Sequence, residues 1–213
     1  MIGHRKIIRT ADLEYPNVYH SPGIELWISQ VFKDFATSSQ VILDVGCGLG
    51  FWGHLIRSYI NPSSFIVGID ISMNKLKIVK DFGIYDTLIC ADASFPPFRE
   101  GFCDSLLSIE VLHSLPNFGE ALRSIEKVVK NQGLIILSQP SNKEHIKILQ
   151  DLGYDVLGNF LRGLFLVRID NGEVIPARRT LNNRFASVAV KILYNKLFRL
   201  RLVKYIIAVK MRD

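Results

Sequence analysis

Three closely spaced glycines follow an apolar run in the first quarter of the chain. The segment Val41–Gly50 reads VILDVGCGLG. Glycine permits turns with positive φ and close approach of a ligand to the backbone, and a helix that begins there offers unpaired N–H groups. The pattern predicts a strand, a ligand-binding turn and a helix, in that order. Because Gly48, Gly50 and Gly53 also fit the G-x-G-x-x-G spacing of dinucleotide sites, the glycines alone leave two kinds of ligand open.

Acidic residues at the predicted strand ends indicate which of these two kinds of ligand the turn binds. Asp44 directly precedes the turn, where a carboxylate would repel the pyrophosphate of NAD. S-adenosylmethionine (SAM) has no phosphate and carries a cationic sulfonium and a cationic ammonium. The next three predicted strands end in Asp70, Asp92 and Glu110, and the carboxyl ends of parallel strands meet at one edge of a sheet. Four carboxylates at one edge are costly without a cation among them, so these residues favour SAM over NAD.

Short apolar runs alternate with amphipathic segments from residue 41 onward, which predicts a doubly wound α/β sheet. Ser72 and Asn142 are suited to begin helices, and Gly83 and Gly153 to end them. The predicted strands are Val41–Val45, Phe65–Ile69, Thr87–Ala91, Ser105–Ile109 and Leu134–Ser138. The predicted helices lie near residues 50–60, 72–82, 118–130 and 142–152.

The flanking parts of the chain are expected to complete one domain. A helix over 21–36 is predicted within an N-terminal cap of residues 1–40, ahead of a core of residues 41–160. A basic insertion of residues 161–200 is then expected before the last strand, within residues 201–213. The elements predicted after the core are strands at Tyr154–Leu157 and Lys204–Lys210, a hairpin of Leu164–Ile169 with Glu173–Ile175, and a helix from about Ala186 to Leu200.

Taken in order, the motifs resemble those of class I SAM-dependent methyltransferases, and most closely the small-molecule group that includes the ubiquinone and menaquinone type. The resemblance covers about residues 40–140 and implies a Rossmann-like sheet of seven strands with SAM as cofactor. The motifs are DVGCGLG (Asp44–Gly50), GIDIS (Gly68–Ser72), ADA (Ala91–Ala93), FPPFREGFCDSLLSIEVLHSL (Phe95–Leu115) and ALRSIEKVVKNQGLIIL (Ala121–Leu137).

The same resemblance implies the cofactor contacts by position. They are Asp44, Gly46, Cys47 and Gly48 around the methionine part, Asp70 on the ribose, Ile71, Asp92 and Ala93 at the adenine, and Glu110 and Val111 beneath the methyl group.

His113, just past the fourth strand, is the candidate catalytic residue. Methyl transfer from a sulfonium is an in-line displacement that needs alignment, exclusion of water and, for some acceptors, a base. The alternative is that His113 is a polar residue near the ligand without a catalytic role. Tyr15, Tyr19 and His20 precede the N-terminal helix, a region that often covers the site in the resembling enzymes. No Asn/Asp-Pro-Pro-aromatic tetrad follows the fourth strand, which disfavours methylation of exocyclic amines on nucleobases.

Basic charge is concentrated in the last quarter of the chain. Residues 161–213 contain 12 lysines and arginines against three acidic residues, whereas residues 1–160 contain 14 against 17. This asymmetry predicts an anionic partner, which could be a nucleic acid, a lipid headgroup at a membrane surface or a phosphorylated metabolite; the alternative is a solvated basic face. An anion site is suggested by the guanidinium groups of Arg162, Arg168, Arg178, Arg179 and Arg184.

Three functions remain open at this point. The first is methylation of a small anionic or lipid-like molecule, the second is methylation of RNA or protein through the basic segment, and the third is SAM binding without chemistry. The absence of an apolar run of about 18 residues or of a signal-like start predicts a cytoplasmic protein without a transmembrane segment. Three cysteines without metal-ligand spacing indicate reduced thiols and no metal site.

Overall fold

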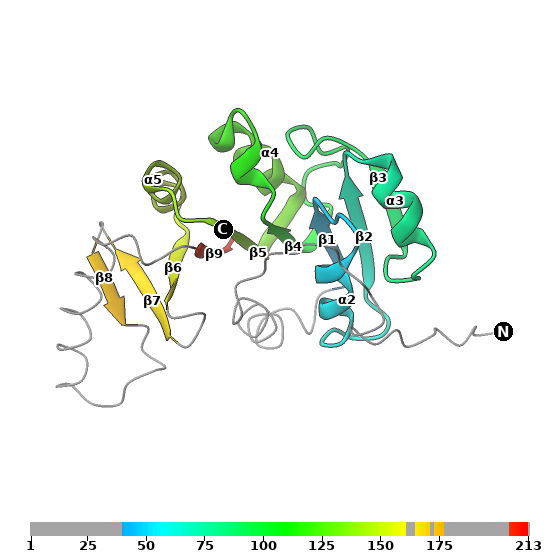
Figure 1. The fold of residues 1–213 in the computed structure, drawn as a ribbon, viewed down its shortest axis with the longest axis horizontal. Coiled ribbons are helices and arrows are strands. Elements are labelled where there is room, and N and C mark those ends of the chain that lie inside the picture. Colours follow the sequence, from blue (N-terminus) through cyan, green and yellow to red (C-terminus); the bar gives the residue numbers. More distant parts are fainter. Residues whose placement is uncertain (1–39, 161–164, 171–172, 177–204, 213) are drawn as a thin grey trace.

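The computed structural model describes residues 40–160, 165–170, 173–176 and 205–212. These residues build one nine-stranded mixed sheet in the order β3-β2-β1-β4-β5-β9-β6-β7-β8 (Figure 1). The strands are β1 (Val41–Val45), β2 (Phe65–Asp70), β3 (Thr87–Cys90), β4 (Cys103–Ile109), β5 (Val129–Pro140), β6 (Asp155–Phe160), β7 (Phe165–Asp170), β8 (Glu173–Pro176) and β9 (Tyr205–Met211). The helices are α2 (Phe51–Arg57), α3 (Met73–Lys80), α4 (Phe118–Val128), α5 (Lys143–Asp151) and the 3₁₀ helix Leu112–Ser114.

The first five strands form the parallel part of the sheet. β1 pairs with β2 on one side and with β4 on the other, so the strand order reverses at β1. In doubly wound sheets such a reversal opens a crevice at the carboxyl ends of the strands, where ligands bind. The predicted α/β fold is confirmed, and the sequence predicted the parallel strands because they are apolar on both faces.

Alternate residues of these strands face two hydrophobic layers. Leu43 and its neighbours on one face pack with residues of α4 and α5, including Leu122 and Leu149. Ile42 and its neighbours on the other face pack with Trp52 and Ile56 of α2. Figure 1 shows α4 and α2 on opposite sides of the sheet. Burial on both faces fixes the strand register, because a shift by one residue would exchange the two layers.

The predicted helix ends are confirmed by backbone and side-chain geometry. Ser72 Oγ accepts a hydrogen bond from the Lys75 N–H at 3.4 Å. Asn142 Oδ1 accepts from the N–H groups two and three residues later, at 2.9 and 3.2 Å. Gly83 and Gly153 follow α3 and α5 with φ of 63° and 83°, a conformation that favours glycine.

The C-terminal strands complete the sheet in antiparallel fashion. β9 lies between β5 and β6, and the β7–β8 hairpin extends the sheet beyond β6. The predicted hairpin is therefore present, and it adds two strands to the expected seven. The prediction that α4 continues to residue 130 and that β5 starts at Leu134 is wrong at the boundary: Val129 already pairs with Cys103 of β4.

Several predictions fall outside the residues that the structure describes. These are the helices over 21–36 and 186–200 and the residues Tyr15, Tyr19, His20, Arg162, Arg178, Arg179 and Arg184. Among the helices that are described, none is long and apolar enough to cross a membrane.

Candidate functional site

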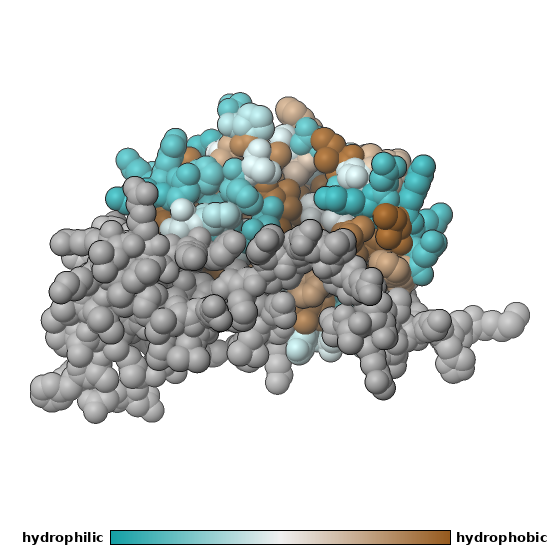
Figure 2. Space-filling model, viewed as in Figure 1, coloured by the Kyte–Doolittle hydropathy of each residue, from teal (hydrophilic) through white to brown (hydrophobic). Residues whose placement is uncertain are grey.

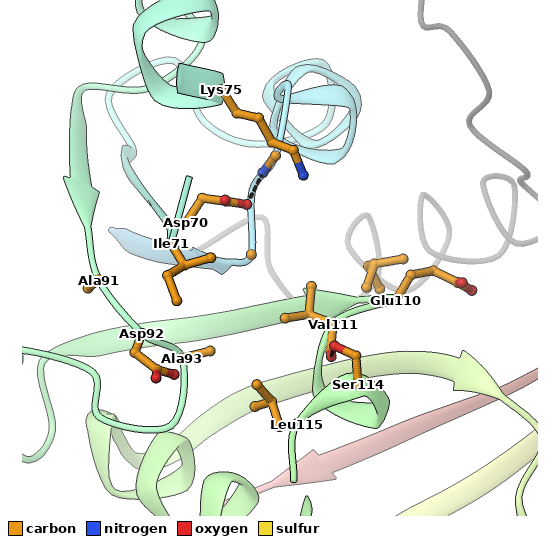
Figure 3. Close-up of a pocket in the computed structure, with 13 residues that line it drawn as sticks. Asp70, Ile71, Lys75, Ala91, Asp92, Ala93, Glu110, Val111, Ser114 and Leu115 are labelled. Atoms are coloured by element: carbon orange, nitrogen blue, oxygen red, sulfur yellow. Dashed lines mark hydrogen bonds between the residues drawn. The ribbon is translucent and has the colours of Figure 1, made fainter. Parts of the chain in front are cut away.

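A cavity of about 310 Å³ lies at the carboxyl ends of β1, β2, β3 and β4 (Figure 3). It brings together eight of the residues assigned to the cofactor from the sequence: Gly46, Gly48, Asp70, Ile71, Asp92, Ala93, Glu110 and Val111. Lys75, Ala91, Ile109, Ser114 and Leu115 complete the lining. A volume of this size falls at the lower end of the range for small-molecule sites.

The glycine turn forms the floor of this cavity. Gly46 and Gly48 have φ of 75° and 54°, which favours glycine at both positions. The N–H groups of Gly46 and Cys47 donate to the Ile69 carbonyl at 2.8 and 2.9 Å, which fixes the turn to the end of β2. A Cβ atom on Gly46 would lie 2.2 Å from Val111 Cγ2, so the turn and the residue after β4 are in close contact.

Asp70 is held in one orientation by the backbone. Its Oδ2 accepts from the Gly48 N–H at 2.9 Å and its Oδ1 from the Ser72 N–H at 2.8 Å. The residue is buried, with only 8% of its surface exposed, yet it lines the cavity. Each carboxylate oxygen can accept a second hydrogen bond, so a polyhydroxyl ligand can bind without displacing the backbone donors.

Apolar side chains form the walls of the cavity next to Asp70. Figure 3 shows Ile71 on one side and Val111 and Leu115 on the other. Ile71 exposes 72% of its surface, which is costly for an aliphatic residue unless a ligand covers it. Asp92 and Ala93 lie between these walls, and Asp92 Oδ1 accepts from the Ser94 N–H at 2.8 Å. This arrangement suits a flat heteroaromatic ring with an amino group at its edge.

Asp44 and Cys47 belong to the glycine turn but do not line the cavity. The Asp44 carboxylate is buried and accepts a hydrogen bond of 2.6 Å from the Tyr85 hydroxyl. Burial raises the Asp44 pKa to about 7, the Tyr85 hydrogen bond opposes the rise, and the nearby Asp70 charge adds to it. Cys47 packs among Leu76 and other apolar residues below the turn, and burial holds the pKa of its thiol well above the usual range.

Glu110 ends β4 in an unusual backbone conformation. Its φ is 62°, in the left-handed region that costs a non-glycine residue roughly 1 kcal/mol or more. Its N–H donates to the Ser138 carbonyl at 2.8 Å, which holds this conformation in place. Burial raises the pKa of the Glu110 carboxyl to about 7. Figure 3 shows its side chain directed away from Asp70 and Asp92, at the opposite end of the cavity.

His113 lies on the 3₁₀ helix directly before the cavity residues Ser114 and Leu115, but it is not itself in the lining. Its Nδ1 atom is buried and has no hydrogen-bond partner among the described residues. Burial lowers the pKa of the imidazole, and the charge of His145 lowers it further. The neutral form is therefore favoured at pH 7, as a base requires.

Lys75 lines the cavity and was not recognised from the sequence. It is the third residue of α3, and side chains in a helix point back toward its N-terminus. Since α3 begins three residues after Asp70, a long side chain at this position reaches the carboxyl edge of the sheet. This offset from the strand-end acid was the signal that could have identified it.

The sheet is parallel over its first five strands and reverses its order at β1, with a glycine turn and three carboxylates around one cavity, and this is the fold of a solved SAM-dependent methyltransferase. Residues 43–137 match the family model described as a methyltransferase domain. This part of the chain is therefore a methyltransferase domain.

Curated relatives and solved structures agree with this assignment. A tRNA (carboxymethyluridine(34)-5-O)-methyltransferase of Arabidopsis thaliana is 39% identical over 110 residues, or 50% of this chain and 26% of the relative. A demethylmenaquinone methyltransferase of Staphylococcus aureus is 27% identical over 121 residues, or 55% of this chain and 50% of the relative. The matched segments thus span half or less of these relatives. A SAM-dependent methyltransferase from Aquifex aeolicus has the same fold, with a TM-score of 0.54, 16% identity, and coverage of 65% of this chain and 85% of that one.

The raised carboxyl pKa values predict that SAM binding strengthens with pH. Asp44 and Glu110 have pKa values of about 7, so both are largely protonated at pH 6 and ionised at pH 8. A cationic ligand favours the ionised forms, and binding therefore releases protons. We expect SAM affinity to rise about three- to tenfold from pH 6 to pH 8, together with proton release in calorimetry in buffers of different ionisation enthalpy.

Without ligand the pH dependence has the opposite sign. A carboxyl whose pKa is raised on folding stabilises the protein below its unfolded pKa, and this contribution is lost as pH rises through the folded pKa. Thermal stability of the free protein should therefore fall from about pH 4 to about pH 7 and change little above that. Asp44→Asn removes one of the two groups and should reduce both effects; a SAM affinity independent of pH in the original chain would contradict the prediction.

Proposed function

We propose that the chain transfers the methyl group of SAM to a small anionic or lipid-like acceptor. The cavity supports the donor half of this proposal, because its acidic lining suits a sulfonium and an ammonium and its apolar walls suit the adenine. Transfer is an in-line displacement, in which the chain aligns the acceptor with the methyl group and excludes water.

Two further recesses adjoin the cavity on the described surface. Leu115 lines both the cavity and a recess of about 360 Å³ at the N-terminal ends of α4 and α5. Asp92 lines both the cavity and a recess of about 510 Å³ with Phe95 at its border. Figure 2 shows hydrophobic surface among hydrophilic residues over the region of α3 and α4, and Phe95 exposes 79% of its surface. Recesses of this size support an acceptor, or an acceptor group, of small-molecule dimensions.

The observation that carries the acceptor class is the charge of residues 161–213, where basic residues outnumber acidic ones by nine. Every residue assigned to SAM contact lies before residue 116, so we assign acceptor selection to the basic insertion of residues 161–200 within a single domain. Arginine binds carboxylates and phosphates through paired N–H groups, which suits an anionic acceptor.

Neutralising Arg178, Arg179 and Arg184 together tests whether the basic insertion selects the acceptor without affecting SAM binding. Acceptor methylation should weaken and lose its salt dependence, because exposed charges are screened within about 10 Å at 0.1 M salt. SAM affinity should stay within a factor of about two. Calorimetry with SAM and methyl transfer at two salt concentrations measure both quantities. Loss of SAM binding by a folded variant, or unchanged methylation at low salt, would contradict the assignment.

RNA is the second candidate acceptor, because a tRNA methyltransferase is among the relatives and the basic segment suits phosphate groups. A methyl-label transfer assay against lipid, small-molecule, RNA and protein fractions separates the candidates. Label in the lipid or small-molecule fraction supports the proposal, and label in a ribonuclease-sensitive fraction supports RNA. Binding of SAM without label in any fraction would support a subunit that has no chemistry of its own.

A further inference from the structure

Among the described residues that line the SAM cavity, Lys75 is the only basic one, and three are acidic. Figure 3 shows its side chain pointing toward the glycine turn, where Gly48 donates to Asp70. Its side chain makes no hydrogen bond or ion pair with any described residue, although carboxylates lie nearby.

The position is unfavourable for a lysine on the grounds of local stability. Lys75 lies in the first turn of α3, at the positive end of the helix dipole, and no acidic residue in that turn compensates it. An acidic or neutral side chain at this place would stabilise the helix better. The dipole of α3 therefore does not favour a lysine here, whereas a ligand with hydrogen-bond acceptors in the cavity would favour it.

The hydrogen-bonding capacity around Asp70 shows which ligand group it suits. The Asp70 carboxylate only accepts hydrogen bonds, and the nearby Gly48 N–H already donates to it. A ribose diol has two O–H donors, which Asp70 can accept, and two oxygens that also accept. Within the described lining, the Lys75 ammonium is the charged donor on this side of the cavity.

We propose that Lys75 binds the ribose of the cofactor together with Asp70. Asp70 accepts from the hydroxyl protons, and Lys75 donates to a hydroxyl oxygen. The inference rests on the proposed use of SAM. It adds a cofactor-binding residue to the glycine turn and the strand-end acids.

Lys75→Met tests the proposal, since it removes the ammonium and keeps an unbranched side chain. The probes are S-adenosylhomocysteine, which has the ribose diol and the amino-acid part, 5′-methylthioadenosine, which keeps the diol but lacks the amino acid, and 2′-deoxy and 3′-deoxy forms of S-adenosylhomocysteine. Calorimetry should show affinity for the first two probes reduced by a similar factor of roughly ten. The loss should largely disappear with the deoxy form that lacks the contacted hydroxyl.

Lys77→Met is the matched control, because Lys77 is an exposed lysine of the same helix outside the cavity lining. It should bind all probes like the original chain. A loss confined to S-adenosylhomocysteine would show that Lys75 pairs with the cofactor carboxylate instead and would overturn the proposal, as would equal affinity of Lys75→Met and the original chain. Failure of the original chain to bind S-adenosylhomocysteine would instead contradict the proposed function.

Discussion

Replacement of Gly46 by alanine is expected to reduce SAM affinity by on the order of 100-fold, about 2.7 kcal/mol. The new Cβ would lie 2.2 Å from Val111 Cγ2 and 2.9 Å from Val111 Cβ, so either the turn or the end of β4 must move. Both segments line the cavity, and the φ of 75° adds strain for a residue with a side chain. Calorimetry with SAM measures the loss, and circular dichroism checks that the variant remains folded.

Gly83→Ala separates backbone strain from the steric effect. Gly83 also has a positive φ, 63°, but a Cβ atom there would meet nothing within 4 Å. This variant should be destabilised by about 1 kcal/mol and bind SAM normally. If Gly46→Ala bound SAM as tightly as Gly83→Ala, the contact with Val111 would not control the shape of the cavity.

Replacement of His113 by alanine is expected to lower kcat by about 100-fold while SAM affinity changes little. His113 directly precedes the cavity residues Ser114 and Leu115, its imidazole has a buried nitrogen without a partner among the described residues, and its lowered pKa favours the neutral form. A neutral imidazole can accept a proton from the acceptor as the methyl group transfers. Activity of the original chain should fall as pH drops through the lowered pKa, and this acid limb should be absent in the variant.

His145→Gln tests the environment of His113 without removing the base. The charge of His145 contributes to the lowered pKa of His113, so its loss should move the acid limb to higher pH. His145 also stacks on Phe118 at 4.1 Å, and the glutamine variant should therefore be checked for stability. Near-normal kcat in His113→Ala would leave alignment of the two substrates as the basis of catalysis.

Local pattern was sufficient to predict most of the parallel sheet. Runs such as Val41–Val45 are buried on both faces and bounded by glycine or polar residues, so strand type and order follow from the sequence. The glycine motif shows the limit of this reasoning. Gly53 completes the dinucleotide-like spacing, yet its Cα faces the Tyr85 ring, and an added Cβ would lie 2.3 Å from the Tyr85 hydroxyl. Gly53 thus makes room for the side chain of Tyr85. The spacing of glycines in the sequence does not distinguish this packing role from contact with a ligand.

Site residues could be predicted from the sequence where the end of a strand determines their position. They were harder to predict where the direction of the side chain decides whether the residue reaches the cavity. Asp70 and Asp92 reach the cavity because parallel strands end at one edge. Asp44 follows the same rule along the chain, but its carboxylate is directed to Tyr85, 41 residues later in sequence. That pairing is not encoded in residue spacing alone, because it depends on how the loop after α3 packs against the glycine turn.

The position of β9 has a consequence for how the chain folds during synthesis. The thirteen described residues that line the SAM cavity all precede residue 116. Strands β1 to β5 have all been synthesised once residue 140 has left the ribosome. β6 has no described partner in this half-sheet, because β9, formed by residues 205–211, lies between it and β5. One edge of β5 therefore stays unpaired while some 65 further residues are translated. The pairing of β5 with β9 joins residues far apart in sequence, so we expect it to form last. The nascent chain would thus acquire a cofactor-binding half before the half that carries the basic insertion.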